Sequence, residues 1–350
     1  MSEETNKQRK KKKNASMKLE EKDRVENDVL EPAAVTTLGH KPSDPDLYAP
    51  HQVVWFRKVA RKDMKFYVFY VLAFVGFILY CPPSPQGHGG KDGRLISKEA
   101  RVVLTAVCAL VAWFTLFVDI YHGTPAQPGD RKWHLLLDGH SGHFSYLTIN
   151  ILTTWAVYWP FSAAAELFWL YSESELVLKA VTATYAFAVF SSTLGTLLTL
   201  LFLKFNWYDK SWRRETLDMY DRRGNKMFRR KILFTHLNQM PIAFFDVVVL
   251  KQNHHILEWA TPALSTVLIA CFTYSLAYLA FTHFNYRTNG GVYPYTFMDE
   301  ILKTWKSEIT FFVALSLFCF VVCVFYYFVA VEADYIEEAV WKRIKMLLTK

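Results

Sequence analysis

The sequence lacks the short motifs that mark many hydrolases and nucleotide-binding proteins. It contains no G-x-S-x-G, H-E-x-x-H or P-loop pattern, which argues against the common serine and zinc hydrolases and the P-loop proteins. Its 11 histidines form no H-x-x-H-H box of the kind that a di-iron lipid desaturase or hydroxylase requires. There is no internal repeat like those of many transporters, so a transporter is the weakest of the functional classes considered.

Cysteine is sparse, and its placement excludes two common uses. The spacing of the five cysteines gives neither a disulfide framework nor a zinc pattern. All five lie within or at the edge of apolar stretches, where small buried hydrophobic residues are expected: Cys81, Cys108, Cys271, Cys319 and Cys323.

Charge is nearly absent from seven stretches of about 20 residues, each long enough to cross roughly 30 Å of hydrocarbon. They cover about 66–82, 101–121, 144–165, 178–203, 233–250, 259–283 and 309–331. Only helices or closed barrels satisfy backbone polarity in lipid, and these stretches are too long and too uniformly apolar for barrel strands. The sequence therefore predicts an all-α, polytopic transmembrane helical bundle of about six or seven spans.

The polar parts divide the chain into three. Residues 1–62 are expected to form a disordered, basic, cytoplasmic tail, residues 63–332 the transmembrane helical domain, and residues 333–350 a C-terminal tail. The first apolar stretch lacks the form of a signal peptide, because a long polar tail precedes it. The side of the membrane on which the C-terminal tail lies stays open.

Positive charge gives the expected orientation. The net charge of +8 comes from the tails and loops rather than from a nucleic-acid surface, so no nucleic-acid partner is expected. The basic run 9–13 and the basic cluster 210–231 are separated by four spans, and the positive-inside rule then places both in the cytoplasm. We expect a multi-pass protein of the endomembrane system, such as the endoplasmic reticulum, or of the plasma membrane. Its protein partners stay open.

Two polar side chains stand at matching depths in the apolar stretches. Thr148 lies about one turn inside the third stretch and His236 about one turn inside the fifth. Both stretches enter the membrane from the same side, so the two side chains lie at a similar depth below the same headgroup layer. The Thr148 hydroxyl could act there as a nucleophile and the His236 imidazole as a base. A threonine that bonds back to its own helix and a histidine satisfied in the core are the alternative interpretations.

The fifth stretch carries a polar stripe, because the spacing puts Gln239 and Asp246 on the helix face of His236. Asp246 is about 15 Å from His236 along a helix, too far to orient the imidazole, and it is better suited to anchoring another helix. Gln239, Asn150 and Asn238 are the candidate supporting residues and oxyanion donors.

A possible metal site precedes the third stretch. Asp138, His140 and His143 have the residue types and spacing of metal ligands. A polar turn at the interface is the preferred interpretation, and neither a metal nor a cofactor is predicted.

Several segments occur in an order that resembles the androgen-induced family of membrane proteins, which includes the androgen-dependent TFPI-regulating protein. They are Phe144-Ser-Tyr-Leu-Thr148, His236-x4-Pro241-x4-Asp246 (with Asp where the family has Glu), His254-His255 and Gly291-Val-Tyr-Pro294. The resemblance covers about residues 100–332. A more distant resemblance to rolling-stone-like proteins, which matches Leu237-Asn238, would shift the histidine out of register.

The first resemblance implies an integral-membrane hydrolase of fatty-acid esters of hydroxy fatty acids. Its threonine nucleophile and histidine base would fall at Thr148 and His236, and its partners would be the lipid ester and the bilayer. The alternative function is that of a non-enzymatic multi-pass scaffold or receptor-like protein.

Overall fold

The structure is a computed structural model that describes residues 50–83, 96–121, 141, 144, 146–208, 227–251, 254–288, 291, 293–332, 339, 342, 343 and 346. All regular elements in these residues are helical, which confirms the predicted all-α class. They are α2 (Pro50–Tyr80), α3 (Lys98–Tyr121), α5 (Leu147–Trp169), α6 (Glu175–Phe202), η2 (Leu203–Trp207), α9 (Met227–Leu237), α10 (Gln239–Phe245), η4 (Asp246–Leu250), α11 (His254–Ala260), α12 (Leu264–Thr288), α13 (Thr296–Ile301) and α14 (Trp305–Val331).

The chain divides into two units after residue 52. Of the first unit, Met1–Gln52, only the first residues of α2 are described, and the second unit, Val53–Lys350, contains all the other helices. The basic run 9–13, most of the basic cluster 210–231, and Asp138, His140 and His143 lie outside the described residues.

Six helical segments within the described residues are long and apolar enough to cross a membrane, which confirms the predicted polytopic bundle. They are Asp63–Tyr80, Lys98–Phe117, Glu175–Phe205, Ile232–Leu250, Leu264–Thr288 and Trp305–Val331. Helix α5, the third predicted span, has 23 residues and is therefore about 35 Å long. It is not among these six segments, and it contains Asn150, Pro160 and Glu166.

Two helix boundaries differ from the sequence-based expectation. Helix α2 begins at Pro50, within the segment 1–62 that was expected to be a disordered tail, while its apolar, membrane-spanning part begins at Asp63. The fifth span is not one continuous helix but the end of α9, then α10, then the π-helical turn η4. Pro241 explains the break at Asn238, because proline has no N–H for the carbonyl four residues earlier and its ring clashes with that carbonyl.

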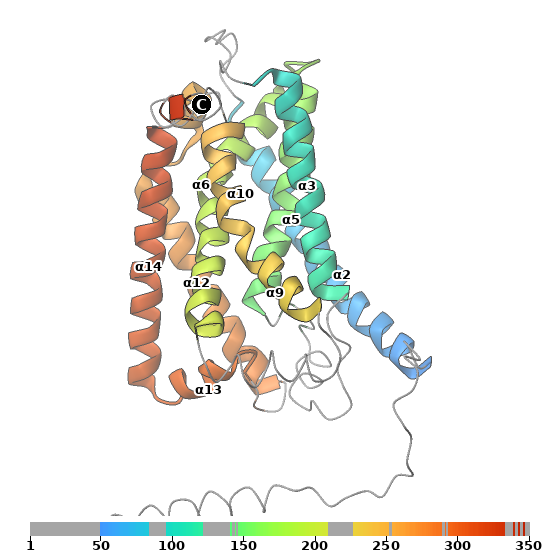
Figure 1. Ribbon diagram of the computed structural model, residues 1–350, viewed down its shortest axis with the longest axis vertical. Coiled ribbons are helices and arrows are strands. Elements are labelled where there is room, and N and C mark those ends of the chain that lie inside the picture. Colours follow the sequence, from blue (N-terminus) through green and yellow to red (C-terminus); the bar gives the residue numbers. More distant parts are fainter. Residues whose placement is uncertain are drawn as a thin grey trace, which may run out of the picture. The chain divides into compact units, whose positions relative to one another are not determined.

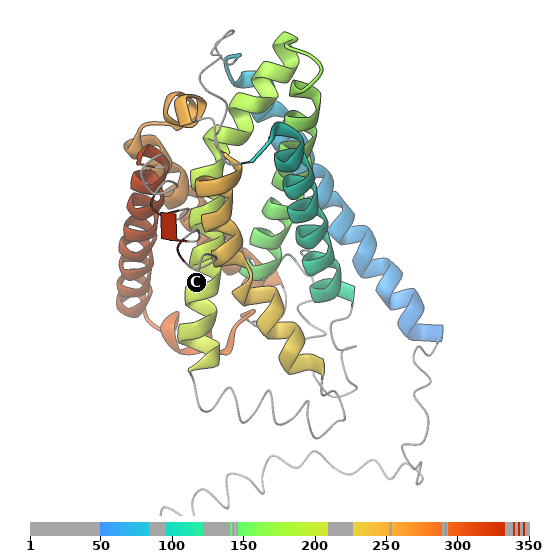
Figure 2. The same cartoon turned by 45° about the horizontal axis from the view of Figure 1, so that its top comes forward.

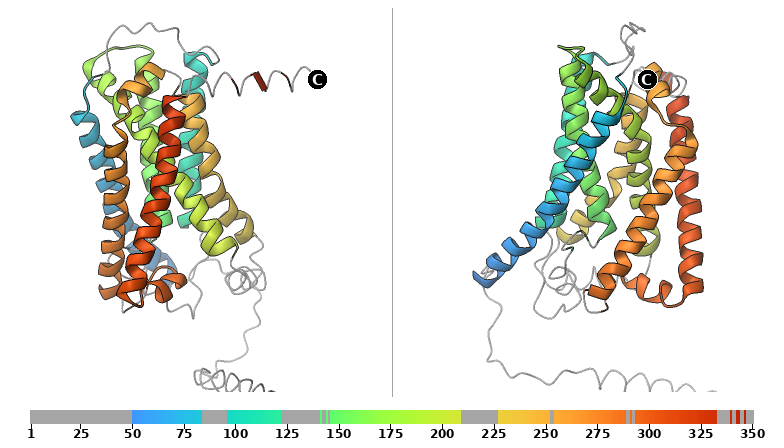
Figure 3. Two further views of the ribbon diagram at one scale, coloured as in Figure 1. Left: turned by 90° about the vertical axis from the view of Figure 1, so that its left-hand side faces the viewer. Right: turned by 180° about the vertical axis from the view of Figure 1, so that it is seen from behind.

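Helix α6 lies at the centre of the bundle and contacts α5, α10, α11, α12 and α14 (Figures 1 and 2). Helix α3 packs on α5, and α12 packs on α14. The starts of α5 and α9 lie at the same end of the bundle, the lower end in Figure 1, as the number of preceding spans predicts. The end of α12, the short helix α13 and the start of α14 lie there too (Figure 3).

Apolar side chains cover the outside of the bundle as well as its core. Large hydrophobic residues such as Leu72 of α2 and Leu317 of α14 are each 62% exposed in the isolated chain. By contrast, α5 and α6 bury threonine, serine and other polar side chains against each other and against their neighbours. This distribution fits a bundle whose outer surface faces lipid.

Helices α5 and α6 approach closely where a glycine of α6 faces a tryptophan of α5. A Cβ atom added at Gly195 would lie 2.3 Å from Cζ2 of Trp155. The Trp155 indole donates a hydrogen bond of 3.1 Å to the Ser191 carbonyl, one turn away on α6, so the ring is held in place. Only glycine leaves room for this packing.

We expect Gly195→Ala to destabilise the protein by about 1–3 kcal/mol, because the added methyl group overpacks a fixed indole ring. The midpoint of thermal unfolding in detergent would fall by several degrees. Gly76→Ala is the matched control, since a Cβ at Gly76 would meet no atom within 4 Å. Equal midpoints for the two variants would contradict the packing argument.

Candidate active site

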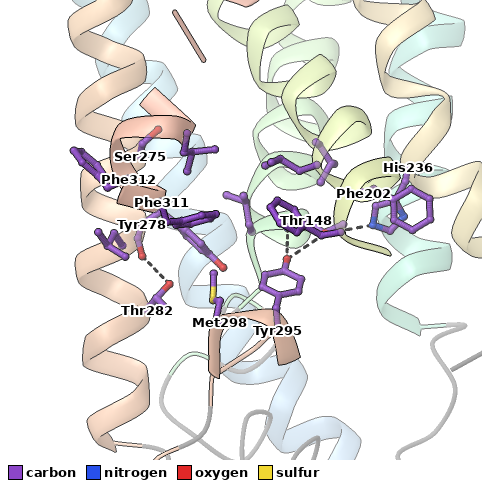
Figure 4. Close-up of a pocket in the computed structure, with 16 residues that line it drawn as sticks. Thr148, Phe202, His236, Ser275, Tyr278, Thr282, Tyr295, Met298, Phe311 and Phe312 are labelled. Carbon is purple, nitrogen blue, oxygen red and sulfur yellow. Dashed lines mark hydrogen bonds between the residues drawn. The ribbon is translucent and has the colours of Figure 1, made fainter. Parts of the chain in front are cut away.

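The ends of two helices bring Thr148 and His236 together. Thr148 is the second residue of α5, and His236 is the last but one of α9, just before the break caused by Pro241. The Thr148 Oγ1 lies 3.4 Å from His236 Nε2, and both residues are 8% exposed (Figure 4). This distance is longer than a strong hydrogen bond, but such contacts are often long in the absence of substrate.

The surroundings of the imidazole decide which nitrogen carries hydrogen. The Nδ1 atom lies 2.8 Å from the Ile232 carbonyl oxygen and 3.0 Å from the Thr235 hydroxyl. A carbonyl oxygen only accepts, so Nδ1 carries the hydrogen and donates it. The Nε2 atom, which faces Thr148, therefore has a lone pair, as a base requires.

Helix α6 holds His236 from the other side. The Thr199 hydroxyl donates a hydrogen bond of 2.6 Å to the His236 carbonyl. The Phe202 ring stacks on the imidazole, with 4.2 Å between centroids and 26° between planes. The main chain and the ring plane of the histidine are thus both constrained.

A third side chain reaches Thr148 from the segment that precedes α13. The Tyr295 hydroxyl lies 3.4 Å from Thr148 Oγ1, and it accepts a hydrogen bond of 3.3 Å from the Thr148 N–H. Tyr295 was not predicted from the sequence. The available signal was its position directly after the run 291–294, in which Gly291 has a φ of +75°.

Thr148 and His236 lie at the wall of an open cavity. Its other walls come from the end of α6, from α12 and from α14, and they are mainly leucine and phenylalanine side chains. Away from the pair, the cavity extends towards Ser275 and Phe312 (Figure 4). A mostly apolar cavity with few polar groups at one place suits a ligand with a long hydrocarbon chain and one polar function.

The three amide side chains predicted to support the pair have other partners. Asn150 donates to the carbonyls of Phe144 and Tyr146 and accepts from the Tyr70 hydroxyl, which organises the start of α5.

On the fifth span, Asn238 donates to the Thr115 hydroxyl of α3. Gln239 donates to the Thr235 carbonyl and to the Asn238 side chain. The main-chain carbonyl of Ile232 and the Thr235 hydroxyl lie beside His236 Nδ1.

A second buried polar cluster lies at the other end of α5. The Glu166 carboxylate lies 3.0 Å from Arg101 Nε and 3.7 Å from Lys251 Nζ. The fully buried Lys251 also donates a hydrogen bond of 2.6 Å to Ser162 and lies 4.7 Å from the Tyr185 ring centroid. These charges are paired and join α3, α5 and η4.

Asp246 belongs to the same end of the bundle. Its carboxylate accepts a hydrogen bond of 2.5 Å from the Tyr158 hydroxyl of α5. The expectation that Asp246 anchors another helix is therefore confirmed. No group of three histidine, cysteine, aspartate or glutamate side chains within the described residues is arranged to hold a metal ion.

We expect Glu166→Gln to destabilise the protein by about 3–5 kcal/mol, because it leaves Arg101 and Lys251 buried without their shared counter-charge. Thermal unfolding in detergent measures the loss. The control is Glu175→Gln, which breaks the exposed pair of Glu175 with Lys179 and should leave the midpoint unchanged. If Glu166→Gln were as stable as the control, the cluster would not hold the helices together.

Comparisons of the chain with protein-family models, with curated proteins and with solved structures found no match in any of the three. The resemblance to the androgen-induced family thus stays an expectation from the sequence. The geometry of Thr148, His236 and their cavity carries the functional conclusion.

Proposed function

We propose that the protein is an integral-membrane hydrolase of lipid esters, with Thr148 as nucleophile and His236 as base. The observation that carries this proposal is the 3.4 Å approach of Thr148 Oγ1 to His236 Nε2, together with the contact of Nδ1 with the Ile232 carbonyl. In the neutral imidazole this contact makes Nε2 the basic nitrogen. Following the resemblance, we propose fatty-acid esters of hydroxy fatty acids as the substrate class.

The first half of the reaction transfers the acyl group to the enzyme. The Thr148 oxygen forms a bond to the ester carbonyl carbon, its proton moves to His236 Nε2, and the carbonyl electron pair moves to the carbonyl oxygen. When this intermediate collapses, the bond to the alkoxy oxygen breaks. That oxygen takes the proton from Nε2 and leaves as the hydroxy fatty acid.

The second half regenerates the threonine. Water gives a proton to Nε2 and attacks the acyl carbon, and collapse then returns that proton to the Thr148 oxygen and releases the fatty acid. The Ile232 carbonyl stabilises the imidazolium in both halves, because it accepts a hydrogen bond from Nδ1. It takes the place that a carboxylate has in a Ser-His-Asp triad.

The orientation in the membrane is also proposed rather than observed. The end of the bundle at which α6 ends and α9 begins carries the exposed basic residues Lys204, in η2 directly after α6, and Arg230, in the first turn of α9. We assign this end to the cytoplasmic side of an endomembrane, such as that of the endoplasmic reticulum, or of the plasma membrane.

Labelling with a fluorophosphonate probe tests the nucleophile. We expect Thr148→Ala and His236→Gln to lose labelling and to lower ester turnover by about 1,000-fold or more. Thr154→Ala is the matched control, since Thr154 is a buried threonine of the same helix whose hydroxyl bonds to the Asn150 carbonyl. Undiminished labelling of Thr148→Ala would reject the proposal. Binding of the lipid without turnover would favour a receptor-like protein instead.

The cavity predicts a limit on acyl chain length. Ser275→Phe would fill the far end of the cavity, so we expect turnover of long-chain esters to fall by about 10-fold or more while short-chain esters are still cleaved. Leu276→Phe, on the neighbouring and 48% exposed position of α12, should leave both rates unchanged. Equal losses of turnover for long-chain and short-chain esters would show that the acyl chain does not extend to Ser275.

A further inference from the structure

We propose that Tyr295 is the oxyanion donor of this site: its phenolic hydrogen bonds the substrate carbonyl oxygen as that oxygen becomes negative. The inference rests on the proposed function. It assigns the role of oxyanion donor, for which the sequence offered Asn150, Asn238 and Gln239 as candidates. Those three amides are engaged with main-chain carbonyls or with other side chains.

The two contacts between the Tyr295 hydroxyl and Thr148 support the assignment. A phenolic hydroxyl has one hydrogen to donate and lone pairs to accept with. The Thr148 N–H donates to the Tyr295 oxygen at 3.3 Å, so the phenolic hydrogen is directed to an acceptor other than that amide. Thr148 Oγ1, at 3.4 Å, is such an acceptor before substrate binds.

The position of Tyr295 fits the path of the reaction. In Figure 4, Tyr295 and His236 approach Thr148 from different sides, so proton transfer to Nε2 and a hydrogen bond from Tyr295 do not compete for the same space. The oxyanion is attached to the carbon that bonds to Thr148 Oγ1 and therefore forms next to the phenolic group. The first turn of α5 adds a helix dipole that favours negative charge there.

The hydroxyl is held in place before substrate arrives. Tyr295 is the N-cap residue of α13, and its ring packs edge-on against Tyr146, with 5.6 Å between centroids. Just before it, Tyr293 stacks on Tyr286 at 4.2 Å and is buried with Met298 of α13. A donor fixed in this way stabilises the transition state without having to reorganise.

Tyr295→Phe removes the hydroxyl and keeps the ring. We expect kcat for the ester to fall by about 100-fold, as for loss of one oxyanion donor, while KM stays within about twofold. The affinity for a trifluoromethyl ketone analogue, which forms a tetrahedral adduct with the nucleophile, should fall by a similar factor. The affinity for a non-hydrolysable ether analogue should not change.

Tyr293→Phe is the matched control, because the Tyr293 hydroxyl lies 3.5 Å from His283 Nδ1 and outside the cavity wall. Burial raises the pKa of Tyr293, so at neutral pH it is a protonated phenol in the same segment. We expect this variant to keep the wild-type kcat and the wild-type affinity for the ketone.

Other results would overturn the assignment. Wild-type kcat in Tyr295→Phe, with Thr148→Ala inactive, would reject the oxyanion role and leave the proposed function in place. Equal losses of ketone and ether affinity would show that Tyr295 contributes to binding of the lipid in general and not to stabilisation of the oxyanion. Full activity of Thr148→Ala would instead reject the proposed function itself.

A second substitution covers the case in which Tyr295→Phe does not fold. 3-Fluorotyrosine at position 295 keeps the hydroxyl and the ring contacts and makes the phenol a stronger donor. We expect tighter binding of the ketone and unchanged binding of the ether. Unchanged ketone binding in this folded variant would also overturn the assignment.

Discussion

A membrane-spanning helix must satisfy its own backbone polar groups, and Pro241 prevents the fifth span from doing so just after His236. The helix breaks at Asn238, because Pro241 has no N–H to pair with the Leu237 carbonyl. Next to the break, Thr199 of α6 donates a hydrogen bond of 2.6 Å to the His236 carbonyl. The same break ends α9 at the histidine, beside the first turn of α5. The site thus depends on one missing N–H.

The buried polar side chains at the two ends of α5 are paired in different ways. At the end near Glu166, the carboxylate lies next to the positive charges of Arg101 and Lys251, and Lys251 also donates a hydrogen bond to Ser162. These contacts connect the helices. At the end near Thr148, the polar groups meet at the wall of a cavity, and their hydrogen bonds are long. A stable anchor at one end allows loosely bonded reactive groups at the other.

The helical bundle could be predicted from the sequence, because runs of apolar residues and the cost of backbone polarity in lipid leave few alternatives. The shared depth of Thr148 and His236 also followed from the order of the spans. The partner of Nδ1 could not be predicted, since a main-chain carbonyl such as that of Ile232 has no signature in the sequence. Tyr295 was missed because its position depends on how the segment after α12 turns back, not on the periodicity of a span. The partners of the three amides could not be predicted, because helix spacing gives the face of a residue but not the partner of its side chain.

The cavity of the site has a kinetic consequence. Its walls are mainly hydrocarbon, and they come from helices that also face lipid. A substrate of the proposed class is dissolved in the bilayer, so its effective concentration is a mole fraction in one leaflet rather than an amount per volume of water. Added detergent or inert lipid would therefore dilute the substrate in two dimensions. Rates measured for this protein have meaning only at a stated composition of the surface in which it lies.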